Sequence, residues 1–147
     1  MTRVSRWAHV GYLGACEAAL QSFGVEIAAV DAGDEGLRTG SIEALVLGSR
    51  GRVELLDLGW TEEHGWGYSR KAEDFPAAET YTHGQFGGEV LPEPDRFAGL
   101  VVRIAAGEEL ADHVPGEPLR YRSAADDDGF AEGLLAYDPA GTDRAGR

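Results

Sequence analysis

Between positions 5 and 23, apolar residues recur at spacings of three and four, which is typical of a helix with one buried face. This stripe consists of Val10, Leu13, Cys16, Leu20 and Phe23. Ser5 can cap the start of the helix, and Gly24 follows at a position where helices commonly end. Trp7 and Tyr12 lie off the centre of the stripe, so the pattern places them towards its edges.

A second helix is predicted for residues 95–106, directly after Pro92 and Pro94. It is the clearest amphipathic segment of the chain, because most of its large apolar residues follow helical spacing. The predicted core face consists of Phe97, Leu100, Val101 and Ile104.

Between the two helices, five segments are rich in β-forming residues and are separated by polar or glycine-containing turns. These segments are 25–30, 42–47, 53–60, 66–69 and 80–86, with the polar stretch 31–36 expected to end the first of them. In 53–60, one face carries Glu54, Leu56 and Leu58 and the other carries Val53, Leu55 and Asp57, which predicts a sheet with one buried and one partly wet face. The order predicts an α+β fold in which an antiparallel sheet of four or five strands and two flanking helices form a two-layer sandwich.

The chain divides into a predicted α+β domain, residues 5–107, and an acidic C-terminal extension, residues 108–147. The extension contains three of the six prolines and a run of three aspartates, which favours a loosely ordered tail. An apolar island interrupts it at nearly helical spacing and consists of Phe130, Leu134, Leu135 and Tyr137. Two interpretations stay open for 128–137: a short helix that docks on its own domain, or a peptide offered to a partner.

Candidate binding residues gather around one turn between two predicted strands. They are Trp60, Glu62, Glu63, His64 and Trp66. A histidine beside carboxylates can act as a general base or bind a metal. Three consecutive residues on a turn diverge, however, so the pattern favours a solvated hairpin tip between two tryptophans that belong to the core or to an interface.

An aromatic patch on the sheet is the alternative use of this region, with Tyr68 and Tyr81 beside the tryptophans. His83 alternates with Tyr81 and can face His64 if their strands are neighbours. Two histidines and a glutamate would supply three zinc ligands, but nothing in the spacing requires a site, so no metal is predicted.

Catalytic and cofactor motifs are missing from the sequence. Cys16 is the one cysteine, lies on an apolar helix face and has no neighbouring base, so it is expected to be a core residue and the chain to lack an internal disulfide. No nucleophile elbow and no phosphate-binding glycine motif occurs. The sequence therefore predicts no cofactor and no catalytic residue.

The formal net charge is -13, from 26 acidic and 13 basic residues spread along the chain. The negative electrostatic field of such a chain repels nucleic acids and anionic lipids, and it favours solubility or a basic partner. No long uncharged apolar run and no signal peptide is recognised, which favours a cytoplasmic protein that binds neither membrane nor nucleic acid. Homodimerisation stays open.

Two motifs resemble an uncharacterised family of short actinobacterial proteins. The first is Trp-Thr-Glu-Glu-His-Gly-Trp at 60–66, and the second is Gly-Gly-Glu-Val-Leu-Pro-Glu-Pro at 87–94, which leads into the last helix. The resemblance covers roughly residues 8–107 and implies an intracellular actinobacterial protein, without an activity or site residue. The order of elements is also similar to that of small acidic secretion chaperones, which dimerise and hold partner segments.

These observations favour a non-enzymatic protein-binding or regulatory module. The alternative is a small-molecule-binding protein or enzyme with an aromatic pocket near Trp60, Trp66 and His64. A mimic of nucleic acid is a third hypothesis, and it requires the acidic residues to form a continuous stripe.

Overall fold

The computed structural model describes residues 7–47, 51, 53–71, 81–85, 89–106, 121–125 and 129–137. The elements are α1 (His9–Ser22), β1 (Glu26–Glu35), β2 (Leu37–Leu47), β3 (Val53–Thr61), β4 (Gly65–Lys71), β5 (Tyr81–Gln85), α2 (Pro94–Ala105), α3 (Phe130–Leu134) and a 3-10 turn, η1 (Leu135–Tyr137). The five strands lie in the order β1-β2-β3-β4-β5, and every neighbouring pair is antiparallel. The predicted α+β fold is confirmed.

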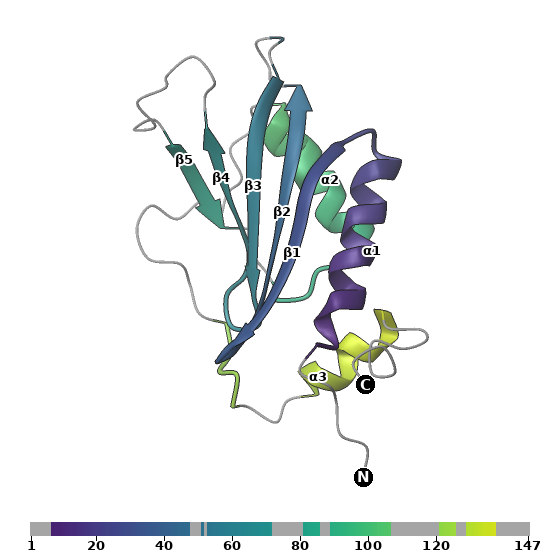
Figure 1. The fold of residues 1–147 in the computed structure, drawn as a ribbon, viewed down its shortest axis with the longest axis vertical. Helices are drawn as coiled ribbons and strands as arrows, with labels where there is room; N and C mark the ends of the chain where they lie inside the picture. Colours follow the sequence, from purple (N-terminus) through teal and green to yellow (C-terminus); the bar gives the residue numbers. More distant parts are fainter. Residues whose placement is uncertain are drawn as a thin grey trace.

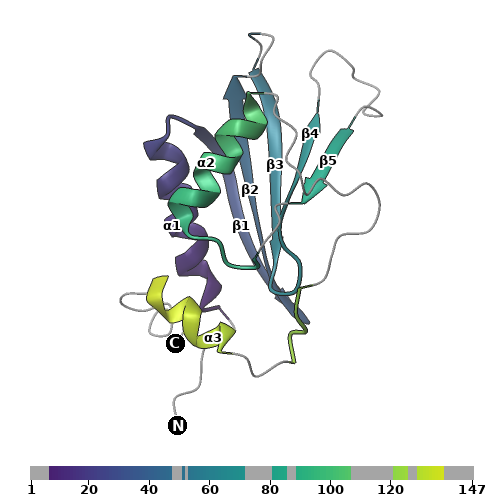
Figure 2. The ribbon, with the colours of Figure 1, turned by 180° about the vertical axis from the view of Figure 1, so that it is seen from behind.

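Helices α1 and α2 cover the same face of the sheet, and the opposite face carries no helix of the described chain (Figure 1). Seen from behind, α2 crosses over the strands while α1 runs beside β1 (Figure 2). The short helix α3 lies next to the beginning of α1 in both views. None of the helices among the described residues is long and apolar enough to cross a membrane.

Strand β1 is longer than the sequence pattern predicts. The polar stretch 31–36 was expected to end it, but the strand continues to Glu35 and the chain turns at Gly36, whose φ of +83° favours glycine. A bulge between Ile27 and Ala29 shifts the register of β1 against β2. Because of this extra residue, Ile27 and Val30 both pack against the core although three positions separate them.

The buried face of α1 differs from the predicted stripe. Val10 and Phe23 are 40% and 47% exposed, whereas Tyr12 is fully buried. The buried positions are His9, Tyr12, Leu13, Cys16, Ala19 and Leu20. They follow helical spacing, but His9 and Tyr12 carry polar atoms. A stripe built only from apolar residues therefore missed them and pointed to a different side of the helix. The helix begins at His9, and the predicted cap Ser5 lies outside the described residues.

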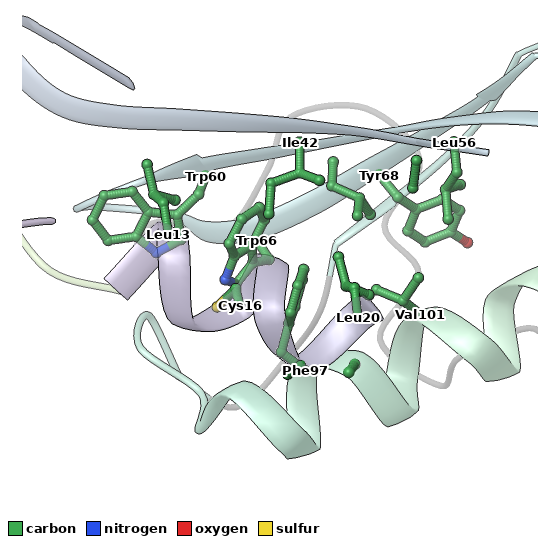
Figure 3. Close-up of a cluster of buried hydrophobic side chains, with 14 of the residues drawn as sticks. Leu13, Cys16, Leu20, Ile42, Leu56, Trp60, Trp66, Tyr68, Phe97 and Val101 are labelled. Carbon is green, nitrogen blue, oxygen red and sulfur yellow. The ribbon is translucent and has the colours of Figure 1, made fainter. Parts of the chain in front are cut away.

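Helix α2 agrees with its prediction apart from its boundaries, which lie one residue earlier. Phe97, Val101 and Ile104 are buried, and Leu100 is half-buried. Phe97 stacks on Trp66 of β4 with ring centroids 4.2 Å apart. Figure 3 shows this pair between the sheet and α2, with Leu20 of α1 beside it. The core is therefore closed by both helices against one sheet face.

The alternation predicted for β3 is confirmed. Leu56, Leu58 and Trp60 are buried beneath the helices, whereas Val53 and Asp57 are exposed on the opposite face. This opposite face, which no helix of the described chain covers, is called the open face below.

Candidate functional site

The turn that joins β3 to β4 is packed into the protein and is not the solvated hairpin tip that the sequence favoured. Glu62 is 1% exposed. Its carboxylate accepts a hydrogen bond from the backbone N–H of Arg38 at 2.5 Å, and its second oxygen lies 3.2 Å from the Arg38 guanidinium. A buried carboxylate requires such a cation and hydrogen bonds to offset its desolvation. Glu62 is thus a structural anchor between β2 and the turn.

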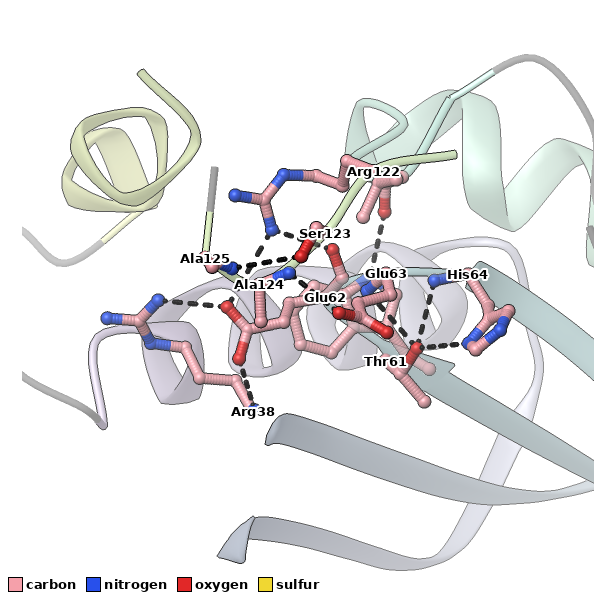
Figure 4. A network of polar contacts seen from close by, with 11 residues as sticks. Arg38, Thr61, Glu62, Glu63, His64, Arg122, Ser123, Ala124 and Ala125 are labelled. Atoms are coloured by element: carbon pink, nitrogen blue, oxygen red, sulfur yellow. Dashed lines mark hydrogen bonds and ion pairs between the residues drawn. The ribbon is translucent and has the colours of Figure 1, made fainter. Parts of the chain in front are cut away.

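Thr61 shapes the rest of this turn. Its hydroxyl oxygen accepts hydrogen bonds from the backbone N–H groups of Glu63 and His64, at 3.3 and 2.9 Å. The same oxygen lies 3.1 Å from His64 Nδ1. Such a local side-chain turn holds the histidine ring beside the threonine (Figure 4). Gly65, with φ of +71°, then leads into β4.

Residues 121–125 run along this turn, a contact that the sequence did not predict. The backbone N–H of Tyr121 donates to the Glu63 carbonyl at 2.8 Å, and that of Ala124 donates to the Glu63 carboxylate at 2.7 Å. Arg122 donates to the Glu62 carbonyl at 2.9 Å and lies 3.7 Å from the Glu62 carboxylate. Figure 4 shows the two arginines, Arg38 and Arg122, on either side of Glu62. The turn therefore binds a segment from about sixty residues further along the chain.

Sequence reasoning missed Arg38 and Arg122. Arg38 could have been found from the sequence. It lies an even number of residues from Ile42, Ala44 and Val46 on β2, so its side chain leaves the strand on the same, buried side. Such a residue needs an acidic partner, and the acidic turn was already singled out. Arg122 had no such signal, because it lies in the extension, outside any periodic segment.

Trp60 and Trp66 belong to the core. Both are fully or almost fully buried, and they are cross-strand partners on β3 and β4. Trp60 donates from Nε1 to the Val90 carbonyl at 2.7 Å, and Trp66 donates to the Tyr12 hydroxyl at 3.1 Å. Tyr68 is also buried. This packing argues against the aromatic pocket proposed for these residues, because their rings already contact protein.

The two motifs at 60–66 and 87–94 meet in space. Tyr12 donates from its hydroxyl to the Pro92 carbonyl at 2.6 Å, next to the bond from Trp60 to Val90. A Cβ on Gly65 would lie 3.0 Å from the Glu89 carbonyl oxygen. Both motifs therefore serve the same contact, the attachment of the segment before α2 to the β3–β4 turn.

His9 is a buried histidine that the sequence analysis left unassigned. Its ring stacks between Trp7 and Trp60, at centroid distances of 5.9 and 5.8 Å. Nε2 lies 3.1 and 3.0 Å from the carbonyls of Gly33 and Thr39, while Nδ1 is buried and has no hydrogen-bond partner among the described residues. Burial lowers the pKa of His9, since it penalises the charged ring.

Cys16 is buried in α1, and burial raises the pKa of its thiol to about 12. The reactive thiolate is therefore scarce at neutral pH. Burial likewise raises the pKa of the Tyr12 phenol. These two groups lie within the core and act there as packing residues and, for Tyr12, as a hydrogen-bond donor.

The strand register does not place His83 opposite His64. His83 pairs with Ser69 in the β4–β5 ladder, and Tyr81 pairs with Lys71. Ser69 lies five residues from His64, about 16 Å along an extended strand. Among the described residues, no group of three or more histidine, cysteine, aspartate or glutamate side chains is placed to hold a metal ion.

The apolar island of the extension docks on the domain. Leu134 is fully buried, and Phe130, Leu135 and Tyr137 are half-buried against the core. Phe130 stacks on Trp60 at 6.1 Å, and Tyr137 meets Tyr12 edge to face at 5.1 Å. Of the two interpretations of 128–137, the structure shows the docked helix, with α3 starting at Phe130.

The open face of the sheet presents a second surface. On it, Leu45 of β2 pairs with Leu55 of β3, and Leu47 pairs with Val53. Leu45 and Leu55 are half-buried, whereas Leu47 and Val53 are 67% and 53% exposed. These four residues are called the apolar strip below.

Around the end of β2, a pocket of about 250 Å³ lies between the ends of α1 and α2. Its lining consists of Phe23, Gly24, Val25, Leu45, Val46, Leu47, Val102, Ala105 and Ala106. This volume is below the range usual for sites of metabolites or drug-sized ligands. Leu45 and Leu47 line this pocket and also belong to the apolar strip, whereas Val102 and Ala105 of the pocket come from the helical layer on the other face of the sheet.

Comparison with known proteins gives no functional assignment: no family model, no curated protein and no solved structure matches this chain.

Proposed function

We propose that the protein is a non-enzymatic protein-binding module that takes a partner protein on the open face of its sheet. The observation that carries the proposal is the exposed cross-strand pair of Leu47 and Val53, next to Leu45 and Leu55. Large apolar side chains that are adjacent and exposed are a common mark of interaction sites. Here they lie side by side on a sheet face that no helix of the described chain covers.

The charges around the apolar strip favour a basic partner. Glu43 and Asp57 are directly opposite each other on β2 and β3, and Glu26 pairs with Leu45. Like charges at opposite positions repel, so a cation placed over Glu43 and Asp57 would relieve a cost within the sheet. A partner with lysine or arginine around an apolar centre fits this arrangement.

A non-enzymatic role is favoured because the groups that suggested chemistry are engaged in packing. Trp60 and Trp66 are buried, and Glu62 is paired with Arg38. Self-association through the open face is disfavoured, because the Glu43 and Asp57 carboxylates of two copies would approach each other. The proposed partner is therefore a different protein.

The cellular setting is part of the proposal. A free thiol at Cys16 suits a reducing cytoplasm, and the resemblance to short actinobacterial proteins suggests that source. The native host is thus an actinobacterium, and the partner is sought there.

The test uses the full chain with Leu47→Thr and Val53→Thr together. Threonine keeps β-branching and removes apolar surface, so the fold is expected to persist. Val10→Thr, at an exposed position of α1 on the other layer, is the matched control. Cross-linking in the native host, followed by binding of the purified candidate, is expected to identify a protein that binds wild type and the control at least tenfold more tightly than the double variant.

Two outcomes would contradict the proposal. One is a set of cross-linked proteins that the double variant leaves unchanged. The other is a dimer of this chain, seen by light scattering, that the double variant abolishes, because the open face would then be a homodimer interface.

A further inference from the structure

Residues 121–125 and 129–137 are held like a bound peptide. The first part binds the β3–β4 turn through the backbone N–H groups of Tyr121 and Ala124 and through the Arg122 guanidinium. The second part packs Phe130 on Trp60 and buries Leu134. Main-chain hydrogen bonds combined with side-chain anchors are the usual means by which a domain recognises a peptide.

The surface beneath this segment has the composition of a recognition site. It offers the rings of Trp60 and Tyr12, and next to them the carboxylate of Glu62. Tryptophan, tyrosine and arginine contacts are enriched at the energetic centres of protein interfaces. Glu62 is already oriented by Arg38, so the carboxylate is positioned before any second arginine arrives.

We propose that the β3–β4 turn, together with Trp60 and Tyr12, is a peptide-binding site that residues 121–125 and 129–137 fill in cis. The site accepts an equivalent segment from a partner protein, with an arginine followed by an apolar helical turn. It lies apart from the apolar strip of the open face, so it does not depend on the function proposed above.

The cis segment defines what the ligand must carry. Arg122 reaches the Glu62 carbonyl and places its guanidinium 4.2 Å above the ring of Phe130. Phe130 in turn stacks on Trp60, which makes a column of cation and two aromatic rings. Leu134, one helical turn after Phe130, fills the buried position. The required features are thus an arginine, an aromatic residue and a leucine one turn further.

Exchange is feasible because the segment is anchored less deeply than the other helices. In α3 only Leu134 is buried, whereas α2 buries Phe97, Val101 and Ile104 among others. Segments with fewer buried contacts open at lower free energy than the rest of a domain. Fourteen residues, 107–120, separate α2 and its cap from Tyr121, so the segment acts as a tethered ligand with a high effective concentration.

The first test is hydrogen exchange of the wild-type full chain, followed by mass spectrometry. Amides of 129–137 are expected to exchange at least about tenfold faster than those of α1 and α2, through an opening that leaves both helices protected. Exchange of all three helices together, only through global unfolding, would overturn the proposal.

The second test adds a fluorescent synthetic peptide of residues 119–138 to the full chain carrying Phe130→Ala and Leu134→Ala. This variant lacks the cis anchors, so we expect it to bind the peptide at least about tenfold more tightly than wild type, whose site is occupied. A peptide carrying Arg122→Ala should bind the variant at least about tenfold more weakly. The Leu47→Thr and Val53→Thr substitutions, made in the same background, should leave peptide binding unchanged. Equal binding to wild type and variant, or none to a variant whose circular dichroism is native, would overturn the site.

Discussion

The carboxylate of Glu62 and the guanidinium of Arg38 form an ion pair at 3.2 Å with both side chains almost completely buried. Removing one member of such a pair leaves the other as an uncompensated buried charge. The pair joins β2 to the turn after β3, and this turn also binds residues 121–125. It is therefore the polar centre of the fold at this end of the sheet.

Glu62→Gln is expected to lower the free energy of unfolding by about 3 kcal/mol or more, because the buried Arg38 guanidinium would lose the carboxylate that lies 3.2 Å from it. Urea denaturation at neutral pH measures the change. The exposed ion pair of Arg96 and Glu89, at 3.0 Å, is the control. Glu89→Gln should cost less than about 1 kcal/mol, since solvent screens that pair. Equal losses in the two variants would contradict a structural role for Glu62.

The stability of the protein is expected to decrease as the pH is lowered, because of His9. Burial lowers the pKa of His9 in the folded state, so the unfolded chain binds a proton more readily. The hydrogen bonds to the carbonyls of Thr39 and Gly33 oppose this lowering of the pKa, as does the nearby Asp34, whereas Arg38 adds to it. Burial of neutral His9 therefore contributes fully to stability above the unfolded pKa of about 6.5. This contribution is lost as the pH falls through the lower pKa of the folded state.

His9→Gln should flatten this dependence. The measurement is the free energy of unfolding in urea between about pH 7.5 and 5.5, above the range in which ordinary carboxylates titrate. Val10→Thr, an exposed and non-titratable position on the same helix, is the control and should keep the wild-type slope. A His9→Gln slope equal to that of wild type would show that other groups carry the pH dependence.

Gly65→Ala tests the contact between the β3–β4 turn and the segment before α2. The φ of +71° disfavours alanine by about 1–2 kcal/mol, and its Cβ would also lie 3.0 Å from the Glu89 carbonyl oxygen and 3.1 Å from Val90 Cα. Gly36→Ala separates the two effects, because Gly36 has φ of +83° but open space around it. We expect thermal denaturation to show a larger loss for Gly65→Ala. Equal losses would mean that the neighbouring backbone moves away without cost.

Cys16 is expected to react slowly with thiol reagents in the native protein. Raising the thiol pKa from 9.0 to about 12 lowers the thiolate fraction at pH 8 about a thousandfold, and burial also blocks access. Colorimetric thiol titration should show one thiol that reacts at once in denaturant and only slowly without it. Rapid reaction under native conditions would show that α1 detaches readily from the core.

Local patterning was enough to predict the layers of this protein. Alternation in β3 placed Leu56 and Leu58 on one face, and helical spacing placed Phe97, Val101 and Ile104 towards the core. Both predictions depend only on the period with which side chains leave a strand or a helix. The antiparallel α+β sandwich follows from them, because each apolar face must be covered by another.

The roles of polar and aromatic residues were decided only by tertiary structure. His9 and Tyr12 belong to the buried face of α1 because carbonyls of β1, β2 and the segment before α2 accept their hydrogen bonds. Glu62 became a buried anchor because β2 brought Arg38 to it. The cost of burying a polar group depends on partners that lie far away in the sequence, so the sequence determined which faces are apolar, and the assembled fold determined which polar groups could join them.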